Sequence, residues 1–180
     1  APVLVKHNPN CIVVLPKAVF DRGVEIGIPA EHIQSMNAGE RLTVGGGIVV
    51  EAIPAAHEDI SVNERGEHHF LGYILRTGNL TIYHSGDCTP YPGLEDMLAQ
   101  AHVDLALLPV NGRDEYRSSR GIAGNFTLPE AVSLCKQAAI PTLLCHHFGM
   151  FAFNTIAVGK AEGKLQHLRG TKQYNLVRSG

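Results

Sequence analysis

The sequence contains no tryptophan, few aromatic residues and no long hydrophobic run. With only 6% aromatic residues, a platform for stacking nucleic-acid bases is not expected. No apolar run reaches the roughly 18 residues that indicate a membrane-spanning helix. The formal net charge of −2 also differs from the basic balance typical of nucleic-acid binding. These absences favour a small-molecule substrate, with no nucleic acid and no membrane as partner.

The cysteines lack the spacing of a metal or disulfide framework. There are four of them, at Cys11, Cys88, Cys135 and Cys145, and no pair forms a Cys-x-x-Cys motif. We therefore expect free, mostly buried thiols in a reducing compartment, which predicts a cytoplasmic protein. Cys88 directly follows Asp87, so a metal ligand there remains an alternative.

The pattern of apolar runs predicts a mixed α/β (α+β) fold. A length of 180 residues with 44% hydrophobic residues suits one domain, residues 1–180. The first half reads as hairpins, and the second half alternates strands with helices. The expected strands are 11–15, 40–44, 47–53, 70–76, 80–84, 104–109, 142–145 and 174–178. The expected helices are 17–26, 92–101, 129–138 (with Thr127 as N-cap) and 155–168.

Metal-competent side chains stand at the ends of three short apolar runs. They are His57, Asp87 and the pair His146-His147. Imidazole and carboxylate groups bind zinc and similar divalent ions, and strand ends commonly meet at a catalytic edge. Each signal has an ordinary alternative, since Asp87 could cap a turn and His57 could be a surface residue. The two adjacent histidines could instead bond to backbone carbonyls.

A long loop, residues 111–125, holds the best candidates for substrate binding. The planar guanidinium of Arg113 suits a phosphate or a carboxylate. Asn111 and Asn125 could orient the substrate, although a turn role for Asn125 is an equal alternative. The remaining charged residues of the loop, Asp114, Arg117 and Arg120, are expected on a solvated face.

Taken together, five segments resemble the metallo-β-lactamase superfamily, in the branch of the L-ascorbate-6-phosphate lactonase and related metal-dependent hydrolases. The similar segments are residues 53–57, 81–87, 103–109, 124–131 and 146–151. They occur in the family's order and spacing, and the resemblance covers most of the chain from about residue 10 onward.

The resemblance implies an αββα sandwich with two divalent metal ions, Zn²⁺ or Mn²⁺, along one edge. His57 would bind the first metal, Asp87 would bridge both as the catalytic residue, and His146 would bind the second. His84 and His147 would support these ligands without binding metal. The implied reaction is the opening of a lactone or ester, with a phosphorylated sugar lactone as the best-known substrate class.

The sequence departs from the family at one point. The superfamily's His-x-His-x-Asp-His motif is absent. The chain therefore resembles the C-terminal part of the fold, lacking its N-terminal portion. We expect homo-oligomers or association with the missing N-terminal segment. A phosphodiesterase of the same superfamily and a catalytically inactive interaction module remain the alternative functions.

Overall fold

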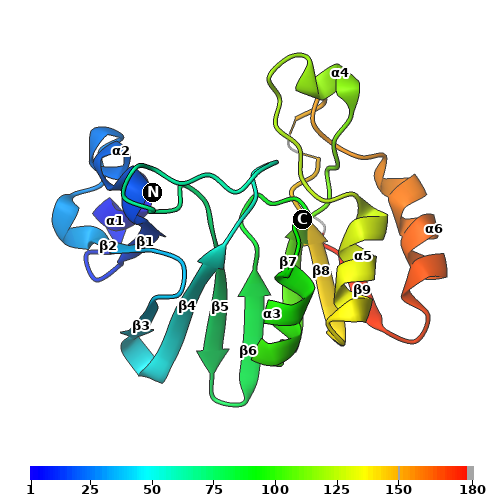
Figure 1. Cartoon of the computed structure of the whole chain (residues 1–180), viewed down its shortest axis with the longest axis horizontal. Helices are drawn as coiled ribbons and strands as arrows, with labels where there is room; N and C mark the ends of the chain where they lie inside the picture. Colours follow the sequence, from blue (N-terminus) through cyan, green and yellow to red (C-terminus); the bar gives the residue numbers. More distant parts are fainter. Residues whose placement is uncertain (150, 178–180) are drawn as a thin grey trace.

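A seven-stranded sheet forms the centre of the molecule in the computed structural model, which describes residues 1–149 and 151–177 (Figure 1). The strands follow one another across the sheet in sequence order. The first four pair antiparallel, and β6 to β9 are parallel. The strands are β3 (Arg41–Val44), β4 (Ile48–Pro54), β5 (Leu71–Thr77), β6 (Leu80–His84), β7 (Leu105–Pro109), β8 (Thr142–His146) and β9 (Gln173–Leu176).

The two expected hairpins are confirmed. Gly45–Gly47 joins β3 to β4, and Gly78 with Asn79 joins β5 to β6. Gly46 has φ 75° and Gly78 has φ 54°, a region that glycine enters without steric penalty. The expected last strand is shorter than predicted, and its predicted end, Arg178, lies outside the described residues.

Helices connect the parallel strands and cover one face of the sheet (Figure 1). They are α3 (Leu94–Ala101), α5 (Leu128–Gln137) and α6 (Val158–Arg169). Tyr83, Leu108, Leu143 and Tyr174 point toward them from four strands and are fully buried. Burying one such side chain contributes about 1.5–3 kcal/mol, so this face supplies most of the core.

Two interactions at the start of α5 explain why this helix was predictable. Thr127 is its N-cap, and Glu130 accepts hydrogen bonds from the Thr127 backbone N–H and hydroxyl, both at 2.8 Å. Thr-x-x-Glu before an apolar stripe is a known start signal for helices.

The opposite face of the sheet is apolar but only half-buried. Because side chains alternate along a strand, the residues between the buried ones share this second face. They are Tyr73, Leu75, Ile82, Leu105, Leu107 and Leu144. We call this surface the open face.

A small N-terminal unit covers one end of the open face. It pairs β1 (Val13–Pro16) with β2 (Ile33–Met36) in parallel and adds α1 (Pro2–His7) and α2 (Phe20–Glu25). Short 3₁₀ turns lie at Lys17–Val19 and Ala30–His32. Met36 packs with Val50, Ala52 and Leu71 in a second small core.

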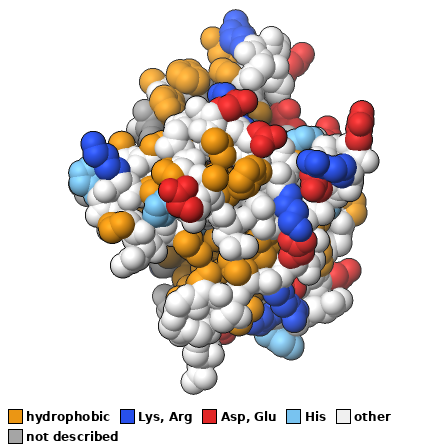
Figure 2. All heavy atoms as spheres, turned by 90° about the vertical axis from the view of Figure 1, so that its left-hand side faces the viewer, with side chains coloured by type: hydrophobic (Ala, Val, Ile, Leu, Met, Phe, Trp, Pro, Cys, Tyr) orange, Lys and Arg blue, Asp and Glu red, His pale blue; other side chains and the backbone are white. Residues whose placement is uncertain are grey.

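The N-terminal unit carries apolar side chains on its own outer surface. Figure 2 shows the side of the molecule that carries this unit, where apolar patches lie between charged groups. The exposed apolar residues of this unit are Val3, Leu4, Ile12, Val24 and Ile26. Among the described residues, no helix is both long and apolar enough to cross a membrane.

The thiols should differ sharply in reactivity. Burial raises the pKa of Cys88 to about 11 and of Cys145 to about 12, and it raises the pKa of Cys135 as well. Cys11 is only half-buried. Since the thiolate is the reactive form, Cys11 alone should react rapidly with a thiol reagent in the folded protein. The expected titration is one fast thiol in native buffer and four in denaturant. A Cys11→Ser variant that keeps the fast thiol would contradict this assignment.

Candidate metal centre

Several strand ends meet at one edge of the sheet, as the sequence predicted. β6, β7 and β8 are parallel, and β4 runs in the same direction as β6 because two antiparallel pairings separate them. His84 is the last residue of β6 and His146 is the last of β8. The centroids of these two imidazole rings lie 5.1 Å apart.

His146 has the properties of an unfilled ligand. Its Nε2 atom is buried and has no hydrogen-bond partner among the described residues. Burial, together with the neighbouring His84 and His147, lowers the pKa of His146 to about 4. The ring is therefore neutral near pH 7, the form in which histidine binds a metal. A buried nitrogen without a partner is costly, and a metal ion would satisfy it.

Asp87 follows a turn that strongly favours glycine. Gly86 has φ 64°, and a Cβ there would meet the Leu71 carbonyl oxygen at 3.0 Å. The Gly86 N–H donates to His84 Nδ1 at 3.0 Å, which leaves the His84 proton on Nε2. Burial lowers the pKa of His84, and the Asp87 charge partly opposes this shift. Asp87 Oδ1 lies 3.6 Å from His147 Nδ1, and both side chains are partly exposed.

His57 lies on a loop that is bonded directly to the Asp87 loop. The Thr89 N–H donates to the Ala56 carbonyl at 2.7 Å, and the Thr89 hydroxyl contacts the Ala56 and Glu58 carbonyls. These bonds hold both sides of His57, whose ring packs edge-on against Phe70 at 4.9 Å.

The predicted ligands are not assembled into a closed site. Among residues 1–149 and 151–177, no three or more His, Cys, Asp or Glu side chains are arranged to hold a metal ion. The structure brings His84 next to His146 and Asp87 next to His147, with His57 on the adjoining loop. These residues fit one wall of a metal centre by their donor chemistry. The ligand roles of His57, Asp87 and His146 stay predictions.

The predicted substrate residues are occupied by internal contacts. Arg113 forms a two-pronged ion pair with Glu130, at 2.8 and 2.7 Å, and bonds to the Asn125 carbonyl. This contact raises the pKa of Arg113, while Arg113 and Thr127 hold the pKa of Glu130 low against the effect of burial. Asn125 Nδ2 donates to Asn111 Oδ1 at 3.0 Å, and both side chains are buried. Substrate contacts for these three residues also stay predictions.

Arg117 corrects one expectation of the sequence analysis. It does not lie on a solvated face, because it is only 8% exposed. Its Nε bonds to Asp114 at 2.8 Å, and its Nη1 bonds to the Asn111 carbonyl and to Asn154 Oδ1, both at 2.9 Å. The reason is a short helix, α4 (Glu115–Ser118), which Asp114 caps and which turns the arginine inward. No sequence pattern indicated this burial.

The sheet is mixed, helices cover one face, and histidines and an aspartate lie at its edge. The Beta-lactamase superfamily domain matches residues 9–148, and the chain belongs to that family. The expected metallo-β-lactamase type of fold is thereby confirmed.

Similar curated proteins are named metal-dependent hydrolases. A "UPF0173 metal-dependent hydrolase" of Pyrobaculum calidifontis is 33% identical over 86 residues, covering 48% of this chain and 36% of the relative. One from Myxococcus xanthus is 23% identical over 163 residues, covering 86% of this chain and 54% of the relative. The matched part of this chain thus spans between about a third and about half of these relatives.

Solved structures share the fold. Igni18, described as a novel metallo hydrolase of Ignicoccus hospitalis, has a TM-score of 0.72 at 14% identity, covering 99% of this chain and 70% of Igni18. The metallo-beta-lactamase fold protein YhfI from Bacillus subtilis has a TM-score of 0.64 at 16% identity, covering 91% of this chain and 60% of YhfI. These likenesses establish the fold alone.

Proposed function

We propose that the protein forms part of a metal-dependent hydrolase that opens a lactone or ester, with a phosphorylated sugar lactone as the substrate class. The observation that carries the proposal is the buried, neutral His146 with its unpaired Nε2, beside His84 and Asp87 at the sheet edge. The name shared by the curated relatives, metal-dependent hydrolase, supports the reaction class. The four free cysteines fit a reducing compartment, which favours the cytoplasm.

In this proposal the residues of the chain have different roles at the site. His57, Asp87 and His146 would hold divalent metal, Zn²⁺ or Mn²⁺, which supplies Lewis-acid activation of water and of the substrate carbonyl when bound. Asp87 would also accept a hydrogen bond from the attacking water and so orient it. His84 and His147 would fix the positions of His146 and Asp87, because each contacts one of them.

We propose that the open face binds a further polypeptide segment that carries the His-x-His-x-Asp-His motif. Leu75, Ile82, Leu105, Leu107 and Leu144 form a continuous apolar surface that is only half-buried. Soluble proteins rarely leave large apolar patches uncovered. A segment packed there would reach the edge that holds His84 and His146, since both belong to strands of this face.

The experiment compares Asp87→Asn with Asp96→Asn in the chain assembled with such a segment. Asp96 is an exposed carboxylate on α3, a helix of the covered face of the sheet, and so serves as a matched control. Even outer-shell residues of metal sites change activity about 10–100-fold, so Asp87→Asn should reduce kcat by at least about 100-fold. Asp96→Asn should leave kcat unchanged.

The substrate panel separates the alternatives. Lactone, ester and phosphodiester substrates are assayed with Zn²⁺ or Mn²⁺. Turnover of phosphodiesters alone would replace the proposal with the phosphodiesterase. An assembled protein without turnover and without bound metal would identify an interaction module instead.

A further inference from the structure

A cavity lies on the helix-covered side of the sheet. Its volume is about 370 Å³, within the range of small-ligand sites. The end of β7, the start of α5 and the first turns of α6 form its walls, through residues such as Val110, Leu128 and Ala161. Val110 shares the helix side with Leu108, whereas His84 and His146 lie on the open face. The cavity is therefore separate from the candidate metal centre.

The charged side chains that line this cavity are all cationic. They are Arg113, Arg117, Lys160 and Lys164, and no lining residue is an aspartate or glutamate. Glu130 neutralises Arg113 through its two-pronged ion pair. Asp114 likewise forms an ion pair with Arg117 through its Nε, so Lys160 and Lys164 supply the net positive charge of the cavity.

Arg117 is a buried cation, and one of its guanidinium nitrogens has no hydrogen-bond partner among the residues that the structure describes. Asp114, Asn111 and Asn154 hold its Nε and Nη1. Its Nη2 has no hydrogen-bond partner among residues 1–149 and 151–177, although the residue is only 8% exposed. A guanidinium fixed on one side presents its free side as a preformed donor for an oxyanion.

Lys160 and Lys164 bring two more charges to the same cavity. They lie four residues apart on α6 and so on one face of the helix, an arrangement of like charges that weakens a helix unless an anion compensates. Neither lysine forms an ion pair within the described part of the chain. The N-termini of α5 and α6 also border the cavity, at Thr127 and Ala157, and their dipoles add positive potential.

We infer that this cavity binds a small molecule through an oxyanion group, held by Arg117, Lys160 and Lys164. Ile156, Leu128 and Val110 provide an apolar wall for the body of the ligand. Two unpaired lysines beside the free Nη2 of Arg117 favour a doubly charged group such as phosphate over a single carboxylate. The inference does not rest on the proposed hydrolysis, because no predicted metal ligand lines the cavity, although two predicted substrate residues, Asn111 and Arg113, do.

The test is an NMR titration of the chain with inorganic phosphate, sulfate and acetate in the presence of EDTA. Sodium chloride at matched ionic strength is the reference. Phosphate and sulfate should shift the backbone signals of Gly112, Thr155 and Ile156 with saturation, and acetate should bind more weakly. Lys160→Ala combined with Lys164→Ala should weaken phosphate binding about tenfold, the loss expected from two charge-assisted contacts near a surface. Both lysines are exposed, so this variant keeps the buried core intact.

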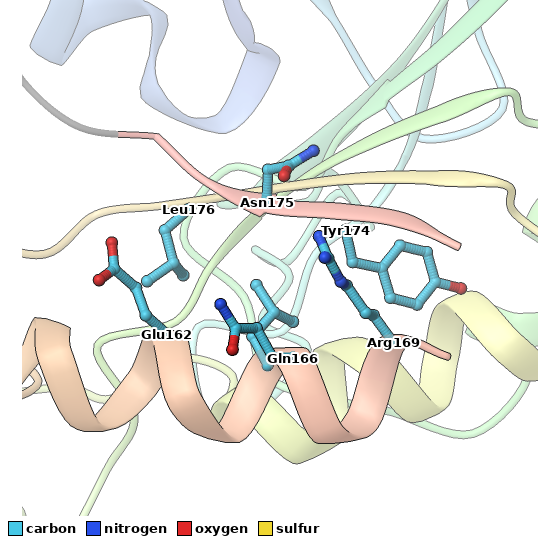
Figure 3. A pocket seen from close by; sticks show the side chains of 7 residues that line it. Glu162, Gln166, Arg169, Tyr174, Asn175 and Leu176 are labelled. Carbon is cyan, nitrogen blue, oxygen red and sulfur yellow. The ribbon is translucent and has the colours of Figure 1, made fainter. Parts of the chain in front are cut away.

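Arg169→Ala is the matched control on the same helix. Arg169 points instead into another cavity, of about 250 Å³, between α6 and β9, together with Glu162 and Tyr174 (Figure 3). Phosphate affinity should be unchanged in this variant. Shifts no larger than those with chloride, or equal losses in the lysine and Arg169 variants, would overturn the inference. Phosphate binding without any hydrolase activity would leave it standing and would count only against the proposed function.

Discussion

Zinc binding by the 180-residue chain alone is expected to be weak and substoichiometric, and its hydrolase activity negligible. No three potential ligands are arranged to hold an ion among the described residues, and the His-x-His-x-Asp-His motif is absent from the sequence. Tight protein sites for zinc use at least about three protein ligands. Addition of a polypeptide that carries the motif on apolar strands should raise zinc affinity by at least about 100-fold, since even outer-shell contacts change it 10–100-fold.

Calorimetric titration with Zn²⁺ measures this effect, and light scattering reports the association. A Leu107→Lys variant tests whether the open face is the docking surface, because a charge at its centre should prevent association. Gln137→Lys, at an exposed position of α5 on the covered face of the sheet, is the matched control. Tight stoichiometric zinc in the chain alone would show that a smaller ligand set suffices. A stable homo-oligomer that ignores the added polypeptide would show that a second copy covers the open face.

Arg117→Ala is expected to be the most destabilising change in the loop between β7 and α5. The substitution removes bonds to a fully buried carbonyl, that of Asn111, and to Asn154 Oδ1. A buried polar group left without a partner costs about 1–3 kcal/mol. The loss of two such bonds and of packing should lower the free energy of unfolding by about 3 kcal/mol. Urea denaturation measures it.

Arg120→Ala provides the comparison for that measurement. Arg120 belongs to the same loop but is exposed, where its guanidinium stacks on Tyr116 at 3.7 Å. Exposed contacts of this kind contribute about 0.5–1 kcal/mol. Equal losses in the two variants would mean that the buried network contributes no more than a surface contact.

Most helices and strands were predictable from the sequence because short-range interactions determine where they begin and end. Glycine turns marked the hairpins, and Thr127 with Glu130 marked the start of α5. Strand β2 was missed because Ile-Gln-Ser-Met shows no clear alternation, and it is a strand only through its pairing with β1. The helix α1 was missed as well, since only Val5 is buried in it.

The site was predictable in outline and not in its contacts. His146 and Asp87 stand out because His146 ends an apolar strand and Asp87 follows another after a Ser-Gly turn. The pairing of Arg113 with Glu130 and the burial of Arg117 depend on how a loop folds back onto α5 and α4. Contacts between distant segments produce no periodic pattern in the sequence. The charge of Arg117 therefore led to the wrong prediction that it lies on a solvated face.

Two residues beside the predicted metal ligands have a strained backbone conformation, which lowers stability but keeps their side chains in place. Glu58 and His147 have φ of 69° and 64°, a left-handed geometry that is unfavourable for residues with a side chain. Each adjoins a predicted ligand, His57 or His146. Glycine at either position would relieve strain of about 1 kcal/mol but remove the contact of Glu58 with the Gly124 N–H or that of His147 with Asp87. Selection for thermostability alone would therefore tend to erode this edge, and its side chains would persist only while their chemistry is under selection.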